Sequence, residues 1–69
     1  MKYAIVIEEA ETNYSAYVPD LPGCVSTGRS LAEIESNMRE AIALHLDGMR
    51  EDGVAPPRPT THVAELEIA

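Results

Sequence analysis

Residues 30–53, SLAEIESNMREAIALHLDGMREDG, carry the strongest local structural signal in the chain. Ser30 and Glu33 form a capping box, in which each side chain accepts a hydrogen bond from a backbone N–H group at the start of a helix. Gly53 suits the left-handed position that follows a helix, and prolines come shortly after it. We therefore predict a helix that begins at Leu31 and ends near Asp52.

The predicted helix is amphipathic. At about 100° per residue, one stripe collects apolar side chains and a histidine, while the charged side chains lie mostly off it. Glu35 and Arg39 are correctly ordered for an ion pair four residues apart. A helix with one apolar stripe is expected to pack on a sheet. The stripe comprises Leu31, Ile34, Met38, Ala41, Ile42, His45 and Met49.

Three strands are predicted before the helix. The run KYAIVIE, which begins at Lys2, is apolar at both odd and even positions and is typical of a strand covered on both faces. A polar hairpin loop leads into a second, antiparallel strand, and Pro19 ends its pairing because proline has no N–H group to donate. A tight turn and a short third strand follow, and Gly28 terminates that strand. The predicted strands comprise residues 2–8, 14–18 and 24–27.

The segment after the helix, residues 61–68 (THVAELEI), alternates between apolar and polar residues. Ala64, Leu66 and Ile68 fall on one side and two glutamates on the other, which predicts a half-buried strand at a sheet edge. The expected fold is therefore α+β, in the order β-β-β-α-β. It has a three-stranded antiparallel meander, one amphipathic helix on one face and one returning edge strand.

The chain has 69 residues, so we expect a single domain over residues 1–69. One core of this size usually provides only about 3–5 kcal/mol of stability. Cys24 is the only cysteine and the two histidines are far apart, so neither a disulfide, a metal site nor a cofactor is expected. Because the first strand is apolar on both faces, one helix cannot cover it. We expect a homo-oligomer, either a dimer or a tetramer, or a partner protein.

Twelve acidic residues against five basic ones give a net charge of -7. The basic residues are scattered singly, so direct nucleic-acid binding is not expected. An acidic surface suits a basic protein partner, although the same charge also keeps a small protein in solution. No apolar run approaches the roughly 18 residues of a membrane span, and the first strand becomes charged at Glu8. We therefore expect a cytoplasmic protein that does not bind a membrane.

The order of residues between the second strand and the helix resembles the HicB family of antitoxins. Residues 14–24, YSAYVPDLPGC, lead into the Ser-Thr-Gly step at residues 26–28 and then into a helix with spaced acidic and amide residues. Gly53 and the prolines after it also match the family's pattern, and the resemblance spans essentially the whole chain. The matching helix positions are Glu33, Asn37, Glu40 and Ala41.

The resemblance implies a partial ribonuclease-H-like fold and a partner, HicA, which is a small basic toxin that cleaves messenger RNA. The HicB-like domain binds this toxin and suppresses its activity, as part of a type II toxin–antitoxin pair. Many members also carry a C-terminal DNA-binding domain, for which the chain up to Ala69 has no room. We therefore expect either a stand-alone antitoxin or an orphan homo-oligomeric scaffold or regulatory domain with no toxin partner.

Five residues are candidates for contact with a partner. Tyrosine is enriched at protein interfaces, and the three tyrosines lie on adjacent predicted strands, where they are expected to form an aromatic patch; alternatively, they are the core aromatics. The proline-stiffened loop after the second strand is an acidic protrusion suited to a basic partner, or a turn and nothing more. These candidates are Tyr3, Tyr14, Tyr17, Asp20 and Leu21.

We expect no catalytic residue and no enzyme activity. A ribonuclease-H-like nuclease needs carboxylates in the middle of its sheet to hold two metal ions, and the predicted strands offer apolar residues there. Cys24 has no neighbouring base to lower its pKa, so it is expected to pack as a small apolar residue. His45 has no nucleophile placed to pair with it and is expected to be structural.

Overall fold

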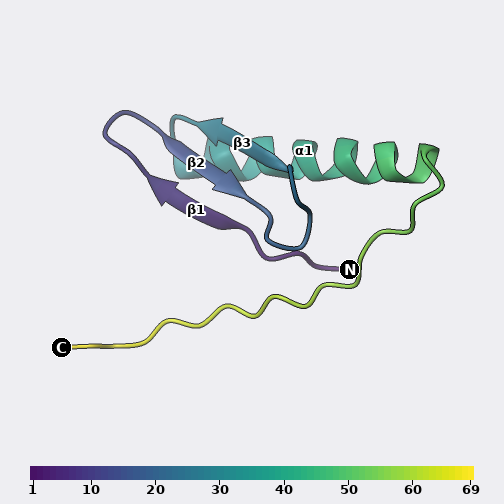
Figure 1. Cartoon of the computed structure of the whole chain (residues 1–69). Coiled ribbons are helices and arrows are strands. Elements are labelled where there is room, and N and C mark those ends of the chain that lie inside the picture. The colour runs from purple at the N-terminus through teal and green to yellow at the C-terminus, as the bar shows by residue number, and fades with distance from the viewer.

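The computed structural model describes all 69 residues and contains three antiparallel strands followed by one helix (Figure 1). The sheet order is β1-β2-β3, so β2 is central and β1 and β3 are the edges. The predicted α+β meander with a single helix is confirmed. The elements are β1 (Val6–Glu9), β2 (Tyr14–Tyr17), β3 (Val25–Gly28) and α1 (Leu31–Glu51).

β1 begins at Val6, later than the predicted start at Lys2. The register places Val6 opposite Tyr17, the last residue of β2. Beyond that point the N–H group of Val18 donates to the carbonyl oxygen of Cys24 in the following turn, at 3.1 Å. Pro19 has no N–H group at all. The residues before Val6 therefore have no donors opposite them, and ladder pairing stops where the proline predicted it would.

The start of α1 agrees with the prediction. The Ser30 hydroxyl accepts a hydrogen bond from the N–H group of Glu33 at 3.1 Å. The Glu33 carboxylate accepts one from the N–H group of Arg29 at 3.3 Å, one residue earlier than in a standard capping box. Both side chains thus satisfy backbone donors at the helix start, which fixes Leu31 as the first helical residue.

The end of α1 is a Schellman motif. The N–H group of Val54 donates to the carbonyl oxygen of Met49 at 2.8 Å, and that of Gly53 donates to Arg50 at 3.1 Å. Gly53 has a φ of 72°, a left-handed conformation that glycine adopts without a steric penalty. The helix therefore ends at Glu51, as the position of Gly53 predicted.

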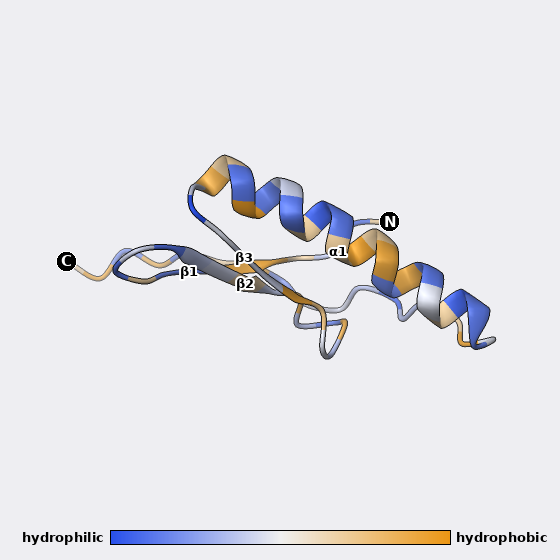
Figure 2. Ribbon diagram, turned by 90° about the horizontal axis from the view of Figure 1, so that it is seen from above, coloured by the Kyte–Doolittle hydropathy of each residue, from blue (hydrophilic) through white to orange (hydrophobic).

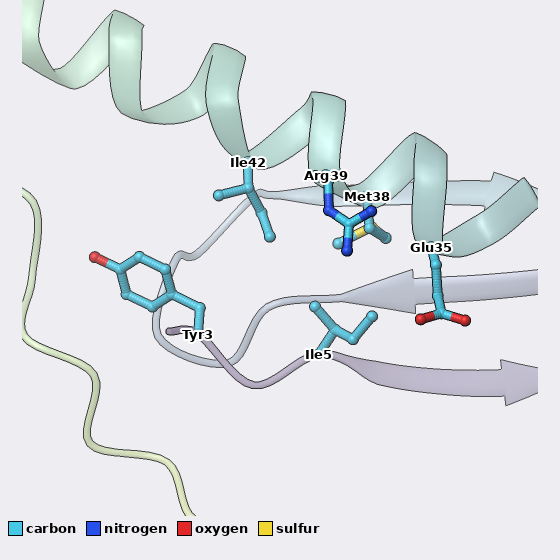
Figure 3. Close-up of a pocket in the computed structure, with 6 residues that line it drawn as sticks. All are labelled: Tyr3, Ile5, Glu35, Met38, Arg39 and Ile42. Carbon is cyan, nitrogen blue, oxygen red and sulfur yellow. The ribbon is translucent and has the colours of Figure 1, made fainter. Parts of the chain in front are cut away.

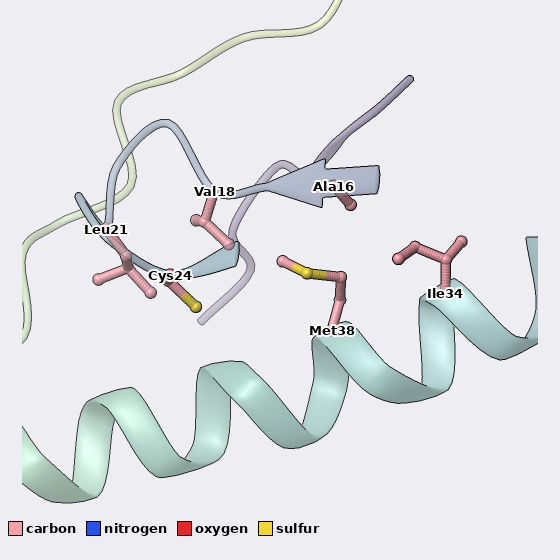
Figure 4. Packing of buried hydrophobic residues seen from close by; sticks show 6 residues of the cluster. All are labelled: Ala16, Val18, Leu21, Cys24, Ile34 and Met38. Atoms are coloured by element: carbon pink, nitrogen blue, oxygen red, sulfur yellow. The ribbon is translucent and has the colours of Figure 1, made fainter. Parts of the chain in front are cut away.

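α1 covers one face of the sheet, and its hydrophobic and hydrophilic residues alternate around the helix (Figures 1 and 2). It packs against β3 and β2, whereas its backbone does not come close to β1. Ile34 and Met38 are 0% and 1% exposed and lie against residues of β2 and the β2–β3 loop (Figure 4). The buried core comprises Ala16, Val18, Leu21, Cys24, Ile34 and Met38.

The predicted helix stripe is largely but not wholly correct. Leu46 lies outside the predicted stripe, yet it packs against the core. Leu31 belongs to the predicted stripe, yet it is 53% exposed at the first position of α1. The predicted ion pair between Glu35 and Arg39 is also wrong, because the chain's two ion pairs are Arg29–Glu33 and Asp47–Arg50. Glu35 and Arg39 instead line an open groove between α1 and the β1 side of the sheet.

The predicted returning strand does not pair with the sheet in this single chain. No helix or strand is present after Gly53, and the C-terminal segment runs away from α1 as an extended chain (Figure 1). Val63, Leu66 and Ile68 are 73%, 81% and 88% exposed. The alternation of residues 61–68 specifies which side of a strand would be buried, but a strand forms only where a neighbouring edge supplies hydrogen-bond partners.

Candidate partner-binding surface

The sheet face opposite α1 carries an apolar strip that crosses all three strands. Side chains alternate along β2, so the burial of Ala16 against α1 places Tyr17 on the opposite, outer face. Val6 and Val25 are the cross-strand partners of Tyr17 and share that face. Tyr17 is 41% exposed and Val25 is 63% exposed. We call Val6, Tyr17 and Val25 the outer-face strip.

Polar residues border the outer-face strip. Ser15 also points outward from β2, and its cross-strand partners Glu8 and Thr27 form the next row on the same face. An open depression of about 380 Å³ lies over β2 and β3. It offers apolar surface beside hydroxyl groups, with the Glu8 carboxylate nearby, which is suited to an apolar side chain flanked by basic ones. Its lining residues are Ser15, Ala16, Tyr17, Val25, Ser26 and Thr27.

The three tyrosines do not form the expected single patch. Tyr3 and Tyr14 pack against the core on the α1 side of the sheet, while Tyr17 lies on the outer face. Tyr14 and Tyr17 are three residues apart in one strand, and a period of two places such residues on opposite faces. Tyr3 also donates from its hydroxyl to the carbonyl oxygen of Pro57 at 2.6 Å. Only Tyr17 therefore presents an aromatic ring on the outer face.

The β2–β3 loop does not protrude freely. Leu21 is 1% exposed and belongs to the core. The Asp20 carboxylate accepts four hydrogen bonds from the segment after the helix: the N–H groups of Thr60 and Thr61 donate to Oδ2, both at 3.2 Å, and their hydroxyls donate to Oδ1 at 3.0 and 2.9 Å. We call this arrangement the Asp20 clamp. It attaches the C-terminal segment to the end of the sheet.

The electrostatics of the clamp favour an ionised carboxylate. Desolvation raises the pKa of Asp20, but the hydrogen bonds from Thr61 and Thr60 together outweigh it, so that the pKa lies below its ordinary value. The clamp therefore accepts hydrogen bonds as an anion throughout the neutral range. Asp20 is satisfied within its own chain and holds the C-terminal segment in place.

The remaining candidate groups occupy structural positions. Cys24 is a free thiol, 3% exposed, and burial raises its pKa, which disfavours the reactive thiolate. His45 is half-buried on α1. No group of three or more histidine, cysteine or acidic residues is arranged to hold a metal ion. α1 also lacks the combination of length and apolar character that crossing a membrane requires.

Sequence reasoning missed two parts of this surface. Val25 and Val6 were not identified as outer-face residues, although counting alternate positions from Tyr17 through a hairpin register finds them. Thr60 and Thr61 were not identified as partners of the Asp20 loop. That contact joins residues 40 and 41 positions apart, and no local pattern in the sequence indicates it.

Comparisons with known proteins place the chain in a family. The family described as "HicB_like antitoxin of bacterial toxin-antitoxin system" matches residues 3–68. A UPF0150 protein of Helicobacter pylori is 43% identical over 65 residues, which cover 93% of this chain and 90% of that protein. An uncharacterised protein of Haemophilus phage HP1 is 45% identical over 58 residues, or 84% of this chain, but the match spans only 44% of the phage protein's length.

A solved structure has the same fold. A chain of the HicA3 and HicB3 toxin-antitoxin complex superimposes with a TM-score of 0.73 at 32% sequence identity, covering 86% of this chain and 70% of that one. The family match begins at Tyr3, three residues before β1, and ends at Ile68 in the C-terminal segment. On these grounds the chain belongs to the HicB-like antitoxin family of bacterial toxin–antitoxin systems.

Proposed function

We propose that the chain is a non-catalytic, cytoplasmic antitoxin that binds and neutralises a small, basic, mRNA-cleaving toxin. The observation that carries this proposal is the likeness of the fold to a chain of a toxin–antitoxin complex, together with membership of the antitoxin family. In this proposal residues 1–69 act as one binding unit, and the chain itself contacts the toxin and no nucleic acid.

Charge and surface chemistry support a basic partner. The net charge of -7 attracts a cationic protein at long range and raises its association rate. The outer-face strip then supplies the apolar contact that short-range binding requires. We assign Tyr17 and Val25 to the contact, because both are exposed on the uncovered face. Of the other candidates, Tyr3, Tyr14 and Leu21 support the sheet from the core side, and Asp20 positions the C-terminal segment.

A second candidate function follows from the unpaired C-terminal segment. Three large apolar side chains exposed on one extended segment are typical of a surface that associates with another chain. A homo-oligomeric scaffold or regulatory domain without a toxin uses that segment alone and has no need of the outer-face strip. The two functions therefore differ in which surface they require.

Coexpression tests the proposed function. The product of the adjacent reading frame, expressed alone, is expected to arrest growth, and this chain is expected to restore growth and to copurify with it. Val25→Lys places a charge in the outer-face strip beside Tyr17 and is expected to weaken toxin binding at least about 30-fold, the loss typical of an interface hot spot. Leu44→Lys is the matched control, because Leu44 on α1 is exposed to a similar degree, 67% against 63%.

Two results would contradict the proposal. One is an adjacent gene product that neither arrests growth nor copurifies with the chain. The other is toxin binding that Val25→Lys leaves intact, which would remove the outer face from the account. Binding is measured by calorimetry on the purified pair, and circular dichroism of each variant checks that α1 and the sheet remain folded.

A further inference from the structure

We infer that the C-terminal segment, residues 62–68, pairs as a fourth strand with the exposed edge of β1 in a second copy of this chain, and that two copies exchange these segments in a symmetric dimer. This inference concerns the contact between copies and does not depend on the proposed toxin. It rests on two features of the same molecule that lack a hydrogen-bonding partner: the extended C-terminal segment and the outer edge of β1.

The C-terminal segment is extended and has the alternating residue pattern of a strand. Residues 62–69 are all exposed, and the apolar side chains Ala64, Leu66 and Ile68 alternate with glutamates. The Asp20 clamp holds Thr60 and Thr61, so the segment leaves the molecule from a fixed point. In Figure 1 it then runs past β1 toward the far end of the sheet and stays separate from it. The side chains of Leu66 and Ile68 are 81% and 88% exposed, and exposure of such apolar side chains to water is unfavourable.

The free edge lies on β1. β1 pairs with β2 on one side only, which leaves backbone donors and acceptors unpaired on the other side. Because α1 packs over β3 and β2, it leaves a groove of about 180 Å³ beside β1 (Figure 3). The groove walls are mostly apolar. They comprise Tyr3, Ile5, Glu35, Met38, Arg39 and Ile42.

The segment and the groove are complementary in size. An apolar cavity of about 150 Å³ holds a benzene molecule, so the groove accommodates a leucine or isoleucine side chain. The seven extended residues 62–68 span about 24 Å, whereas the four residues of β1 span about 14 Å. The segment is therefore long enough to pair with β1 and to continue past Ile5 and Tyr3, which line the groove. Leu66 and Ile68, on the same side of the segment, would enter it.

A second copy can cover both the groove and the C-terminal segment that one chain leaves exposed. In the single chain the groove is open and the segment is exposed, although the two belong to the same molecule. A two-fold axis brings the segment of each copy to the β1 edge of the other. The same symmetry operation therefore covers the β1 edges of both copies and both C-terminal segments. The exchange leaves no unpaired β1 edge, so it closes at two copies instead of forming a fibre.

The first test is the mass of the chain in solution, measured by size exclusion with light scattering. The wild-type chain is expected to be a dimer of 7.5 kDa subunits. Leu66→Lys combined with Ile68→Lys is expected to weaken dimerisation at least about 1,000-fold, because four large aliphatic side chains per dimer lose their burial. Since neither side chain is buried within its own chain, each subunit remains folded.

The matched control places the same two charges elsewhere. Val25→Lys combined with Leu44→Lys replaces two exposed apolar side chains, one on the outer face (63% exposed) and one on α1 (67% exposed). The dimer is expected to persist in this variant. A monomeric wild-type chain would overturn the inference. So would a dimer that survives the two lysines in the segment, or one that only the control variant dissociates, since the contact would then be the outer face.

The second test asks whether pairing occurs between copies. In a mixture of isotope-labelled and unlabelled chains, filtered NOE spectra are expected to show contacts from the methyl groups of Leu66 and Ile68 in one copy to those of Ile5 and Ile42 in the other. The same contacts confined within one copy would contradict the exchange. Both tests use the isolated chain, so their failure is distinguishable from failure of the proposed antitoxin function.

Discussion

α1 and the C-terminal segment both carry one apolar side and one charged side, yet they differ completely in burial. Ile34 on α1 is 0% exposed, whereas Ile68 in the segment is 88% exposed. The apolar side of α1 meets β2 and β3 of its own chain. The apolar side of the segment meets nothing. Similar patterns therefore have different outcomes, according to whether a partner surface lies within reach.

The difference shows what each part of the molecule is available for. The α1 side of the sheet forms the stable core and is occupied by its own chain. The outer-face strip, the β1 edge and the C-terminal segment remain accessible to other polypeptides. Substitutions on the two sides should therefore affect different properties: stability on the α1 side, and association on the open side.

The largest effect on stability is expected for Ile34→Ala. Removing a fully buried isoleucine side chain costs about 2–5 kcal/mol, through lost burial and the cavity left behind. That approaches the whole stability of a domain of this size, about 3–5 kcal/mol. Ile68→Ala is the control from the other region, and in dilute, monomeric protein it is expected to change the free energy of unfolding by less than about 0.5 kcal/mol. Urea unfolding followed by circular dichroism measures both; equal losses would contradict the comparison.

A slightly smaller effect is expected for Gly28→Ala at the closest approach of sheet and helix. A Cβ atom added at Gly28 would lie 2.8 Å from the backbone nitrogen of Ile34, so β3 and α1 would have to separate. Such overpacking costs about 1–3 kcal/mol. Gly48→Ala on α1 is the control: its Cβ meets nothing within 4 Å, and a helix interior favours alanine by about 0.5–1 kcal/mol. A shift of the urea midpoint in the same direction for both variants would contradict the close packing of Gly28 against the backbone of α1.

The Ser30 cap is expected to contribute less. Ser30→Ala removes the acceptor of the Glu33 N–H group and is expected to cost about 1 kcal/mol. Ser36→Ala, inside the exposed part of the same helix, controls for the loss of a hydroxyl and should leave stability unchanged or slightly higher. Thermal unfolding of the two variants compares them directly. A cost at Ser36 equal to that at Ser30 would contradict the capping role.

The smallest effect is a local one at the Asp20 clamp. Since the folded pKa of Asp20 lies below its unfolded value, the clamp's stabilisation is fully present above the unfolded pKa and is lost as the pH falls through the lowered folded pKa. NMR shifts of the Thr60 and Thr61 amides should follow this titration, and Asp20→Asn should abolish it. A titration midpoint at or above that of Asp20 in the urea-unfolded chain would contradict the clamp.

Much of the fold follows from local chemistry in the sequence. Ser30 and Gly53 mark the helix ends because each satisfies backbone groups within a few residues of itself. Pro19 marks the end of β2 pairing because it lacks an N–H group. These features act over one turn of chain, and a single sequence contains all the information that they need.

The errors concern contacts between distant residues. The alternation of residues 61–68 was recognised, but it did not reveal that no edge of the same chain pairs with them. The contact of Asp20 with Thr60 and Thr61 depends on how the chain returns after α1. The tyrosine patch failed for a simpler reason: strand parity places Tyr14 and Tyr17 on opposite faces, which the spacing alone indicates.

Amide hydrogen exchange of residues 62–68 in the isolated wild-type chain tests most directly whether apolar surface left open by one helix is covered by a second copy. We expect slow exchange in this segment at concentrations where the chain is dimeric, and fast exchange there once Leu66→Lys and Ile68→Lys are introduced. Exchange at the rate of an unstructured peptide in the wild-type chain, whatever its concentration, would contradict it.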